Sequence, residues 1–432
     1  MPSAGDHRYD VLIVGGGPSG ASCAYWLAEA GWDVAVVEKK HFPREKTCGD
    51  GLTPRAVRQL ADMGLEGALD GAHRYRGLRS VAFGRSLDLP WPKVPGFPTH
   101  GYTITRHDLD GLVVGRTERA GATVLQGTEA LAPLDPEPAG GPGALAGCAG
   151  AVVATSGGGP AELRARYVVV ADGANSRFGR ALGTSRNREY PQGMALRGYY
   201  RSDRSGEDMI EGHLDIRDAA GNVVPGYGWV FPLGDGRVNV GVGLLSTDRR
   251  WKGLNTSRLM DAFVAQAGTA WGISPQAACG PATGGRLPMG MAVGPRTGEN
   301  TLVVGDAGGL INPFNGEGIA YGYETGRLAA AFLGEALGGG GRERLEAYEA
   351  HLDATYGDYY RVGRAFVRLI SDPRRMRLCV STGMRSHAFM AQLLRIMANL
   401  MRPGPVGPAE VSYRAMVGTA KLLERLDPAR WA

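Results

Sequence analysis

The sequence predicts a mixed α/β (α+β) fold with a Rossmann-like dinucleotide-binding domain, an inserted antiparallel β-sheet domain and a helical C-terminal region. Three apolar runs of strand length, 11–14, 168–171 and 301–304, lie far apart in the chain, and each precedes a glycine-rich or acidic motif. Between the last two, residues 194–246 hold several alternating segments, which predict an antiparallel sheet. From about residue 340 onward the pattern is mostly helical, with a break at 403–405.

These observations predict a discontinuous first domain. A chain of 432 residues is long enough for two or three domains. The expected dinucleotide-binding domain comprises 1–185 and 295–335, with a β-rich substrate domain at 186–294 and a helical region at 336–432.

The shorter elements follow from periodicity and turn residues. Residues 46–60 are expected to form a glycine-containing loop that leads into a helix, and Asp108 or Asp110 is expected to cap a helix within 103–119. Residues 134–160, rich in Gly, Pro and Ala, predict a hairpin with a long tip. The other expected elements are strands at 9–14 and 33–38 and helices at 18–30 and 317–333.

The composition argues against several classes of protein. The five cysteines are scattered without a CxxC pair, and the eight histidines lack metal-ligand spacing, so neither a disulfide framework nor a zinc site is expected. The first apolar run, 11–14, leads into GGGPSG, which is a turn and not a cleavage site. No apolar run approaches the roughly 20 residues that span a bilayer.

The first glycine motif has the pattern of a dinucleotide-binding turn. Gly15, Gly17 and Gly20 form GxGxxG between a predicted strand and a predicted helix. Gly15 permits the tight turn, Gly17 lets a pyrophosphate approach the backbone, and Gly20 lets the helix pack on the strand. Glu38 lies at the end of the second strand, 18 residues after Gly20. A carboxylate there accepts hydrogen bonds from a ribose and repels a 2′-phosphate.

Later motifs favour FAD over NAD. Arg106 lies in TITRHDLDGL, Asp172-Gly173 follows one buried strand, and Gly305-Asp306 follows another. Asp306 is suited to accept hydrogen bonds from a ribityl chain, and the helix that starts near Gly316 would direct its N-terminus at the flavin ring edge. Each motif alone also fits a surface arginine, a strand-ending turn or a helix cap, but their order together predicts FAD.

This ordered set resembles the para-hydroxybenzoate hydroxylase superfamily of flavoproteins. Within it, PREKTCGDGL at 43–52 is similar to the PRxKPCGGGL loop of the geranylgeranyl reductase family. GYGWVFP at 226–232, followed by Gly241 and Gly243, resembles the YxWxFP and GxG signature of that family. CGDGLTPRAV and NPFNGEGIAYGYETGRLAA look most like its actinobacterial menaquinone reductase branch. The resemblance covers residues 9 to about 330.

The resemblance implies FAD-dependent reduction of an isoprenoid C=C bond, most like one unit of the menaquinone polyprenyl tail. Together with the motifs above, it gives the expected FAD-binding residues. They are Gly15, Gly17, Ser19, Gly20, Glu38, Cys48, Gly49, Gly51, Arg106, Ala130, Asp306, Pro313, Gly316, Gly318 and Ile319.

The loop around Cys48 leaves two questions open. By resemblance Cys48 lies by the flavin, where it either modulates the flavin potential, supplies a proton, or is a small residue packed against the cofactor. Thr47 stands where the family has Pro, and Asp50 where it has Gly. Asp50 is either a carboxylate that tunes protonation near the flavin or an ordinary solvated turn residue.

Tyr227, Trp229 and Phe231 alternate and therefore share one face of a strand. They form either core packing or an aromatic wall that holds an extended apolar chain, since an isolated alkene offers no polar handle. Reduction needs a hydride from reduced flavin and a proton for the other carbon. The candidate catalytic residues are Cys48, Tyr227 and Trp229, and the proton source is Cys48, Tyr227 or the flavin itself.

The segment 361–402 contains nine arginines and one acid, Asp372, with apolar residues between them. A basic amphipathic helix there predicts contact with an anionic membrane surface, and the alternative is a helix packed on the protein with a solvated basic face. We expect a cytoplasmic protein, peripheral at the inner face of the cell membrane. Its expected partners are a prenylated lipid substrate and NAD(P)H or a reduced electron carrier, and no nucleic acid.

Four other functions stay open. They are a reductase of another geranylgeranyl or polyprenyl lipid or specialised metabolite, an FAD-dependent aromatic hydroxylase, a flavin halogenase and a non-enzymatic prenyl-binding protein. Tyr227 in place of the first Trp of the halogenase WxWxIP motif argues against the halogenase. The intact Glu38 and Asp306 motifs argue against a binding protein.

Overall fold

The computed structural model describes residues 7–141, 143–155, 158–247, 251–401, 407–427 and 431. The predicted break at 403–405 lies outside them. The helices are α1 (Pro18–Glu29), α2 (Pro54–Asp62), α3 (Arg106–Arg119), α4 (Arg177–Ala181), α5 (Thr256–Trp271), α6 (Ile319–Glu335), α7 (Gly341–Leu352), α8 (Asp358–Ile370), α9 (Pro373–Gly383), α10 (His387–Met397) and α11 (Pro408–Leu426). The strands are β1 (Arg8–Val14), β2 (Val34–Glu38), β3 (Gly51–Leu52), β4 (His73–Tyr75), β5 (Gly77–Ala82), β6 (Arg85–Pro90), β7 (Gly101–Thr103), β8 (Thr123–Gln126), β9 (Thr128–Leu134), β10 (Gly150–Thr155), β11 (Pro160–Val170), β12 (Ser185–Arg186), β13 (Gln192–Arg201), β14 (Met209–His213), β15 (Gly226–Pro232), β16 (Arg237–Leu245), β17 (Thr283–Pro288), β18 (Val293–Gly294) and β19 (Thr301–Val303).

The first sheet brings the three predicted motif strands together. Its order is β8-β2-β1-β11-β10-β9, with β19 beside β11, and β1, β2, β8, β11 and β19 run parallel. The last residues Val14, Val170 and Val303 are in register across neighbouring strands. The motifs that follow these strands therefore meet at one edge of the sheet, where ligands of such sheets bind.

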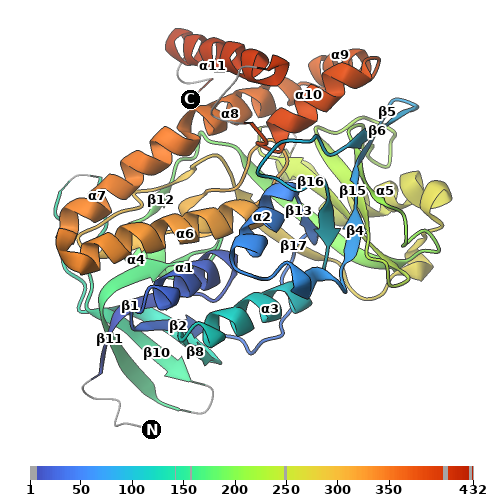
Figure 1. The fold of residues 1–432 in the computed structure, drawn as a ribbon. Coiled ribbons are helices and arrows are strands. Elements are labelled where there is room, and N and C mark those ends of the chain that lie inside the picture. Colours follow the sequence, from blue (N-terminus) through green and yellow to red (C-terminus); the bar gives the residue numbers. More distant parts are fainter. Residues whose placement is uncertain are drawn as a thin grey trace.

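Helices α1, α3 and α6 lie together along this sheet in Figure 1. Small residues let α1 and α6 approach closely, because a Cβ atom at Gly326 would lie 2.2 Å from the Ser19 carbonyl oxygen. This close contact fixes the start of α1 against α6.

The second sheet is wider than the predicted insert. Its order is β17-β13-β16-β15-β14-β5-β6, so β5 and β6 join it from residues 77–90. The pairing of β14 with β5 is parallel, whereas the other pairs are antiparallel. The sequence interpretation did not anticipate this hairpin, which turns at Phe83 and Gly84, both with positive φ. The domain limits given above remain predictions.

One local prediction was wrong. Helix α3 is capped by Thr105, whose Oγ1 accepts a hydrogen bond from the Asp108 amide at 3.3 Å, and not by Asp108 or Asp110. A threonine directly before the helix is better placed to reach the free amides of the first turn. The hairpin with a long tip predicted within 134–160 is present, because β9 and β10 pair antiparallel and Glu137 bridges Gly147. Strand β10 also pairs with β11. Residues 142, 156 and 157 lie outside the described residues.

The segment 361–401 forms α8, α9 and α10 and not one continuous amphipathic helix. Asp372 lies between α8 and α9 and caps α9. Its carboxylate accepts hydrogen bonds from the Arg374 and Arg375 amides, both at 2.9 Å. Figure 1 shows α9 and α10 next to β5 and β6, away from α1 and α3.

Candidate active site

One cavity of about 1550 Å³ extends from the edge of the first sheet to α9 and α10. Ligand pockets are usually about 300–1,000 Å³. The volume is therefore sufficient for a large cofactor together with a second, extended ligand.

The N-terminus of α1 forms one end of this cavity. Gly15 has φ of +107°, and a Cβ atom there would lie 2.4 Å from the Ala171 carbonyl oxygen, so no other residue fits this turn. Near Gly17 the nearest atom to an added Cβ is 3.9 Å away, which leaves room for a ligand at the helix N-terminus. Gly20 does not line the cavity. Its added Cβ would lie 1.9 Å from the Gly15 carbonyl oxygen, so Gly20 serves helix packing.

Glu38 lies beside this turn, buried at the end of β2. Its carboxylate accepts hydrogen bonds from the Gly16 and Lys40 amides, both at 3.1 Å. Arg44 lies 3.4 Å from the same carboxylate. These contacts fix the carboxylate at the cavity wall, where a ribose would be recognised.

Arg106 lines the cavity, but its charge is already neutralised. Its Nε and Nη2 donate to the two oxygens of Asp110, each at 2.8 Å. Arg44 contacts the same Asp110 at 3.0 Å and also faces the cavity. The sequence interpretation did not select Arg44, although it lies within the quoted PREKTCGDGL loop.

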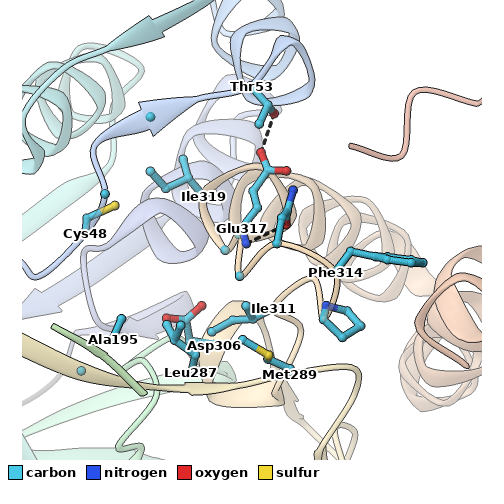
Figure 2. A pocket seen from close by; sticks show the side chains of 18 of the residues that line it. Cys48, Thr53, Ala195, Leu287, Met289, Asp306, Ile311, Phe314, Glu317 and Ile319 are labelled. Atoms are coloured by element: carbon cyan, nitrogen blue, oxygen red, sulfur yellow. Dashed lines mark hydrogen bonds between the residues drawn. The ribbon is translucent and has the colours of Figure 1, made fainter. Parts of the chain in front are cut away.

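The structure brings the other predicted FAD-binding residues to the same cavity. Those that line it are Ser19, Cys48, Gly49, Gly51, Ala130, Asp306, Pro313, Gly316, Gly318 and Ile319. Burial raises the pKa of the Asp306 carboxyl, and Lys46 and Arg106 oppose that shift. Figure 2 shows Asp306, Cys48 and Ile319 around the pocket. A glycine-lined helix N-terminus, a carboxylate for a ribose and a second buried carboxylate together fit FAD.

Asp50 is not a solvated turn residue, since it is 0% exposed. Its Oδ2 accepts hydrogen bonds from the Tyr199 hydroxyl at 2.6 Å and from the Asn239 amide at 2.8 Å. Within the described part of the chain its Oδ1 has no hydrogen-bond partner, and the residue lines the cavity. Burial raises the pKa of Asp50 to about 6.

The side-chain amide of Asn239 joins Asp50 to the loop that contains Cys48 and to β15, the strand that carries the alternating aromatic residues. Asn239 donates to the Cys48 carbonyl at 2.9 Å and accepts from the Trp229 indole at 2.9 Å. Burial raises the pKa of the Cys48 thiol, and the nearby Arg106 opposes that shift. This hydrogen-bonded group therefore fixes Cys48 and Trp229 relative to each other. The sequence interpretation did not select Asn239.

The three alternating aromatic residues do form one row on β15. Ring centroids are 5.7 Å apart for Tyr227 and Trp229 and 6.3 Å apart for Trp229 and Phe231. All three line the cavity. The Tyr227 hydroxyl donates a hydrogen bond to the Asn315 carbonyl oxygen at 2.8 Å. Burial raises the pKa of this hydroxyl, so it keeps its proton. Gly49 and Gly51 leave room for Phe231, because their added Cβ atoms would lie within 3.3 Å of its ring.

Beyond this row the cavity is apolar. One wall of this apolar part is formed by side chains of the second sheet and of the loop that follows β6. The other wall is formed by α9 and α10. The apolar arm is defined by Leu78, Leu89, Trp91, Ile210, Leu214, Met376, Val380, Met390, Leu393 and Leu394. Cys379 and Phe389 line the cavity and are also exposed, so the arm reaches the molecular surface between α9 and α10.

The nine arginines of 361–402 do not form one basic face. Four of them are engaged by the protein. Arg361 contacts Glu424 at 2.7 Å, Arg364 is buried over the Tyr190 ring, Arg368 donates to the Glu189 carbonyl, and Arg395 contacts Glu410. Arg402 lies outside the described residues.

Four arginines remain on the surface near the end of the arm: Arg374, Arg375, Arg377 and Arg385. Two apolar residues of the same segment are also exposed, Leu378 of α9 and Phe389 of α10, with exposed fractions of 68% and 55%. In the described residues, no helix combines the length and apolar character needed to cross a bilayer.

Comparison with known proteins agrees with this geometry. The FAD binding domain family model matches residues 8–196. Menaquinone reductase of Mycolicibacterium smegmatis is 39% identical over 91% of this chain and 92% of its own. Menaquinone reductase of Mycobacterium tuberculosis is 39% identical over 98% of this chain and 99% of its own. The chain belongs to the menaquinone reductase family. Its cofactor is FAD, and it is an FAD-dependent oxidoreductase of the geranylgeranyl reductase type.

More distant members and solved structures extend the comparison. Digeranylgeranylglycerophospholipid reductase of Methanoculleus marisnigri is 28% identical over 81% of this chain and 83% of its own. A geranylgeranyl bacteriochlorophyll reductase-like structure from Thermoplasma acidophilum has a TM-score of 0.71 at 22% identity, covering 98% of this chain and 99% of that one. A flavin-dependent brominase, Bmp2, has a TM-score of 0.72 at 17% identity, covering 96% of this chain and 100% of that one. At these identities the two structures establish the shared fold alone.

Proposed function

We propose that this protein saturates one C=C bond in the polyprenyl tail of menaquinone. The observation that supports this proposal is the continuity of the cavity, which joins an FAD-type groove at Gly15 and Glu38 to an apolar arm that opens between α9 and α10. A polar substrate of a hydroxylase would find few partners in that arm. The relatives named menaquinone reductase match nearly the whole chain and support the same substrate.

FAD, when bound, supplies the hydride chemistry. The residues of the chain position both ligands. Glu38 binds the ribose, Asp306 accepts hydrogen bonds from the cofactor, and the row of Tyr227, Trp229 and Phe231 holds the prenyl chain at the flavin end of the arm. Cys48, whose backbone carbonyl accepts a hydrogen bond from Asn239, packs at the flavin end of the arm.

The surface at the end of the arm suits a membrane. We assign the exposed arginines of α9 and of the turn before α10, with Leu378 and Phe389, to peripheral contact with the anionic inner face of the cell membrane. A lipid could then enter the arm without crossing water. NAD(P)H or a reduced carrier supplies the electrons.

The test is a single anaerobic reaction. The purified protein is reduced with dithionite and mixed with menaquinone in detergent, and the lipid is examined by mass spectrometry after its ring has been reoxidised. A persistent gain of two hydrogens is expected, because only saturation of the tail survives reoxidation. Unchanged menaquinone beside a bound and reducible flavin would exclude this substrate. Reaction of a geranylgeranyl ether lipid in its place would establish the other polyprenyl substrate.

A further inference from the structure

Glu317 is a half-buried acid, with one carboxyl oxygen shielded from solvent, that the sequence interpretation did not consider. It lies in the NPFNGEG motif just before α6, within the turn at 316–319, and it lines the cavity. Its backbone is held on both sides, since its amide donates to Asn315 Oδ1 at 3.0 Å and its carbonyl accepts from the Asn312 amide at 2.9 Å. The side chain therefore starts from a fixed backbone position at the wall of the cavity that would hold FAD.

The carboxyl group has one hydrogen-bonded oxygen and one free oxygen. Thr53 Oγ1 donates to Oε1 at 2.5 Å, and Figure 2 shows this contact, with the Glu317 side chain pointing away from Asp306. Oε2 is shielded from solvent and has no hydrogen-bond partner among the residues that the structure describes. An unpaired carboxylate oxygen in such a place is costly unless it carries a proton or meets a ligand.

The groups around Glu317 favour a protonated acid near neutral pH. Burial raises its pKa to about 7, with Glu324 of α6 acting in the same direction, whereas Thr53, Arg55 of α2 and Asn315 lower it. Arg55 is itself paired with Glu324 at 2.7 Å, so its charge is largely neutralised. The phenols of Tyr75 and Tyr321 complete the surroundings, and burial raises the pKa of both.

The other candidate acids are less suitable. The Tyr227 hydroxyl is engaged by the Asn315 carbonyl. Asp50 also has one unpaired oxygen among the described residues, but its Oδ2 accepts two hydrogen bonds, from Tyr199 and Asn239, which favour its charged form. Among the same residues the Glu317 carboxyl group accepts one hydrogen bond, from Thr53, and its neighbour Tyr75 lines the same cavity as Trp229.

We propose that Glu317 is the general acid of the reaction, a role that rests on the proposed function. As the π bond breaks, one alkene carbon receives the hydride from reduced FAD, which is oxidised by two electrons. The other carbon receives the proton of the Glu317 carboxyl group. Glu317 is left as a carboxylate, and a proton from solvent restores it.

Two readouts test this role. The first is infrared difference titration of the FAD-loaded protein without substrate. A component of the protonated carboxyl band that declines as the pH passes about 7 is expected in the wild type and is expected to be absent in Glu317→Gln, whereas the Asp50 component, which declines near pH 6, should stay in both. The second is single-turnover oxidation of the reduced flavin by menaquinone, which we expect to be at least about 10²-fold slower in Glu317→Gln. Glu118→Gln, at an exposed site on α3, is the matched control and should change neither readout.

Thr53→Val keeps the acid and removes the hydrogen bond that lowers its pKa. The alkaline limb of the turnover profile should therefore move to higher pH, which a purely structural role of Glu317 would not cause. An unchanged band in Glu317→Gln, an unmoved limb in Thr53→Val, or wild-type turnover in Glu317→Gln would overturn the proposal. If wild-type protein leaves menaquinone unchanged but the band behaves as expected, the substrate is wrong and Glu317 still holds its proton.

Discussion

Gly20 is the position of the glycine motif that tolerates a side chain least. An added Cβ would lie 1.9 Å from a backbone oxygen of the same turn, so Gly20→Ala must separate α1 from β1. We expect a loss of about 3 kcal/mol of unfolding free energy and reduced FAD occupancy. Thermal unfolding and flavin absorbance measure both. Gly67→Ala, where nothing lies within 4 Å of the added atom, is the control, and equal stability of the two variants would contradict the packing role.

Asp50 makes a pH-dependent contribution to stability. Burial raises its pKa to about 6 in the folded protein, from 3.8 for an ordinary aspartate, so the folded state holds a proton that the unfolded state has released. The free energy of unfolding should therefore fall as the pH rises from about 4 to 6, by up to about 3 kcal/mol. Asp50→Asn keeps an oxygen for Tyr199 and Asn239 and should remove this slope. Denaturant unfolding across that range tests it, and an unchanged slope in the variant would show that another group titrates.

The predicted residues that line the cavity and the residues that the sequence interpretation did not select differ in how they act. Gly15 and Glu38 act through their own backbone turn or strand end, so a local motif sufficed to locate them at the cavity. Arg44 and Glu317 lie in motifs that were quoted, but their importance depends on Asp110 and Thr53, which lie far away in sequence. Spacing alone does not reveal such contacts.

At the scale of elements, α9 and α10 carry the predicted membrane surface. Replacing Arg374, Arg375, Arg377 and Arg385 together with Gln should weaken binding to anionic phosphatidylserine vesicles by up to about 10³-fold, since each charge near the surface contributes about 1 kcal/mol. Vesicle sedimentation at low and high salt measures this. The same replacement at Arg164, Arg166, Arg342 and Arg344, which are also exposed, is the control for lost net charge. Equal weakening in both variants would show that α9 and α10 are not the contact surface.

The sheets show why element boundaries are harder to predict than motifs. The strand–glycine–helix pattern at 9–30 is local, and β1 and α1 agree with it within one residue at each end. The recruitment of β5 by β14 joins Gly77 to Met209, and only tertiary packing decides that pairing. Likewise, the arginine count of 361–402 could not show that Arg364 and Arg368 turn inward onto residues 189–190.

At the scale of the whole molecule, the cavity connects parts that are remote in sequence. The first sheet and α1 provide the FAD end, the second sheet provides one wall of the arm, and α9 with α10 provides the other. The residues of the arm should therefore determine which length of prenyl chain can react. The residues of the FAD end should determine how tightly the cofactor binds and should not select the chain length.

Ile210 offers a way to separate these two parts. It is a buried residue of β14 in the wall of the arm, so Ile210→Trp should obstruct the arm without altering the turn at Gly15. We expect FAD content to stay at the wild-type level and kcat/KM for a long-chain menaquinone to fall at least about tenfold, which corresponds to about 1.4 kcal/mol. A menaquinone with a single isoprene unit should react as in the wild type, because its chain ends before the obstruction. Leu131→Trp, at a position that is 52% exposed on β9, controls for the added ring. If both chain lengths lost activity equally in Ile210→Trp, the effect would come from the overpacked sheet, and the arm would not be the path of the tail.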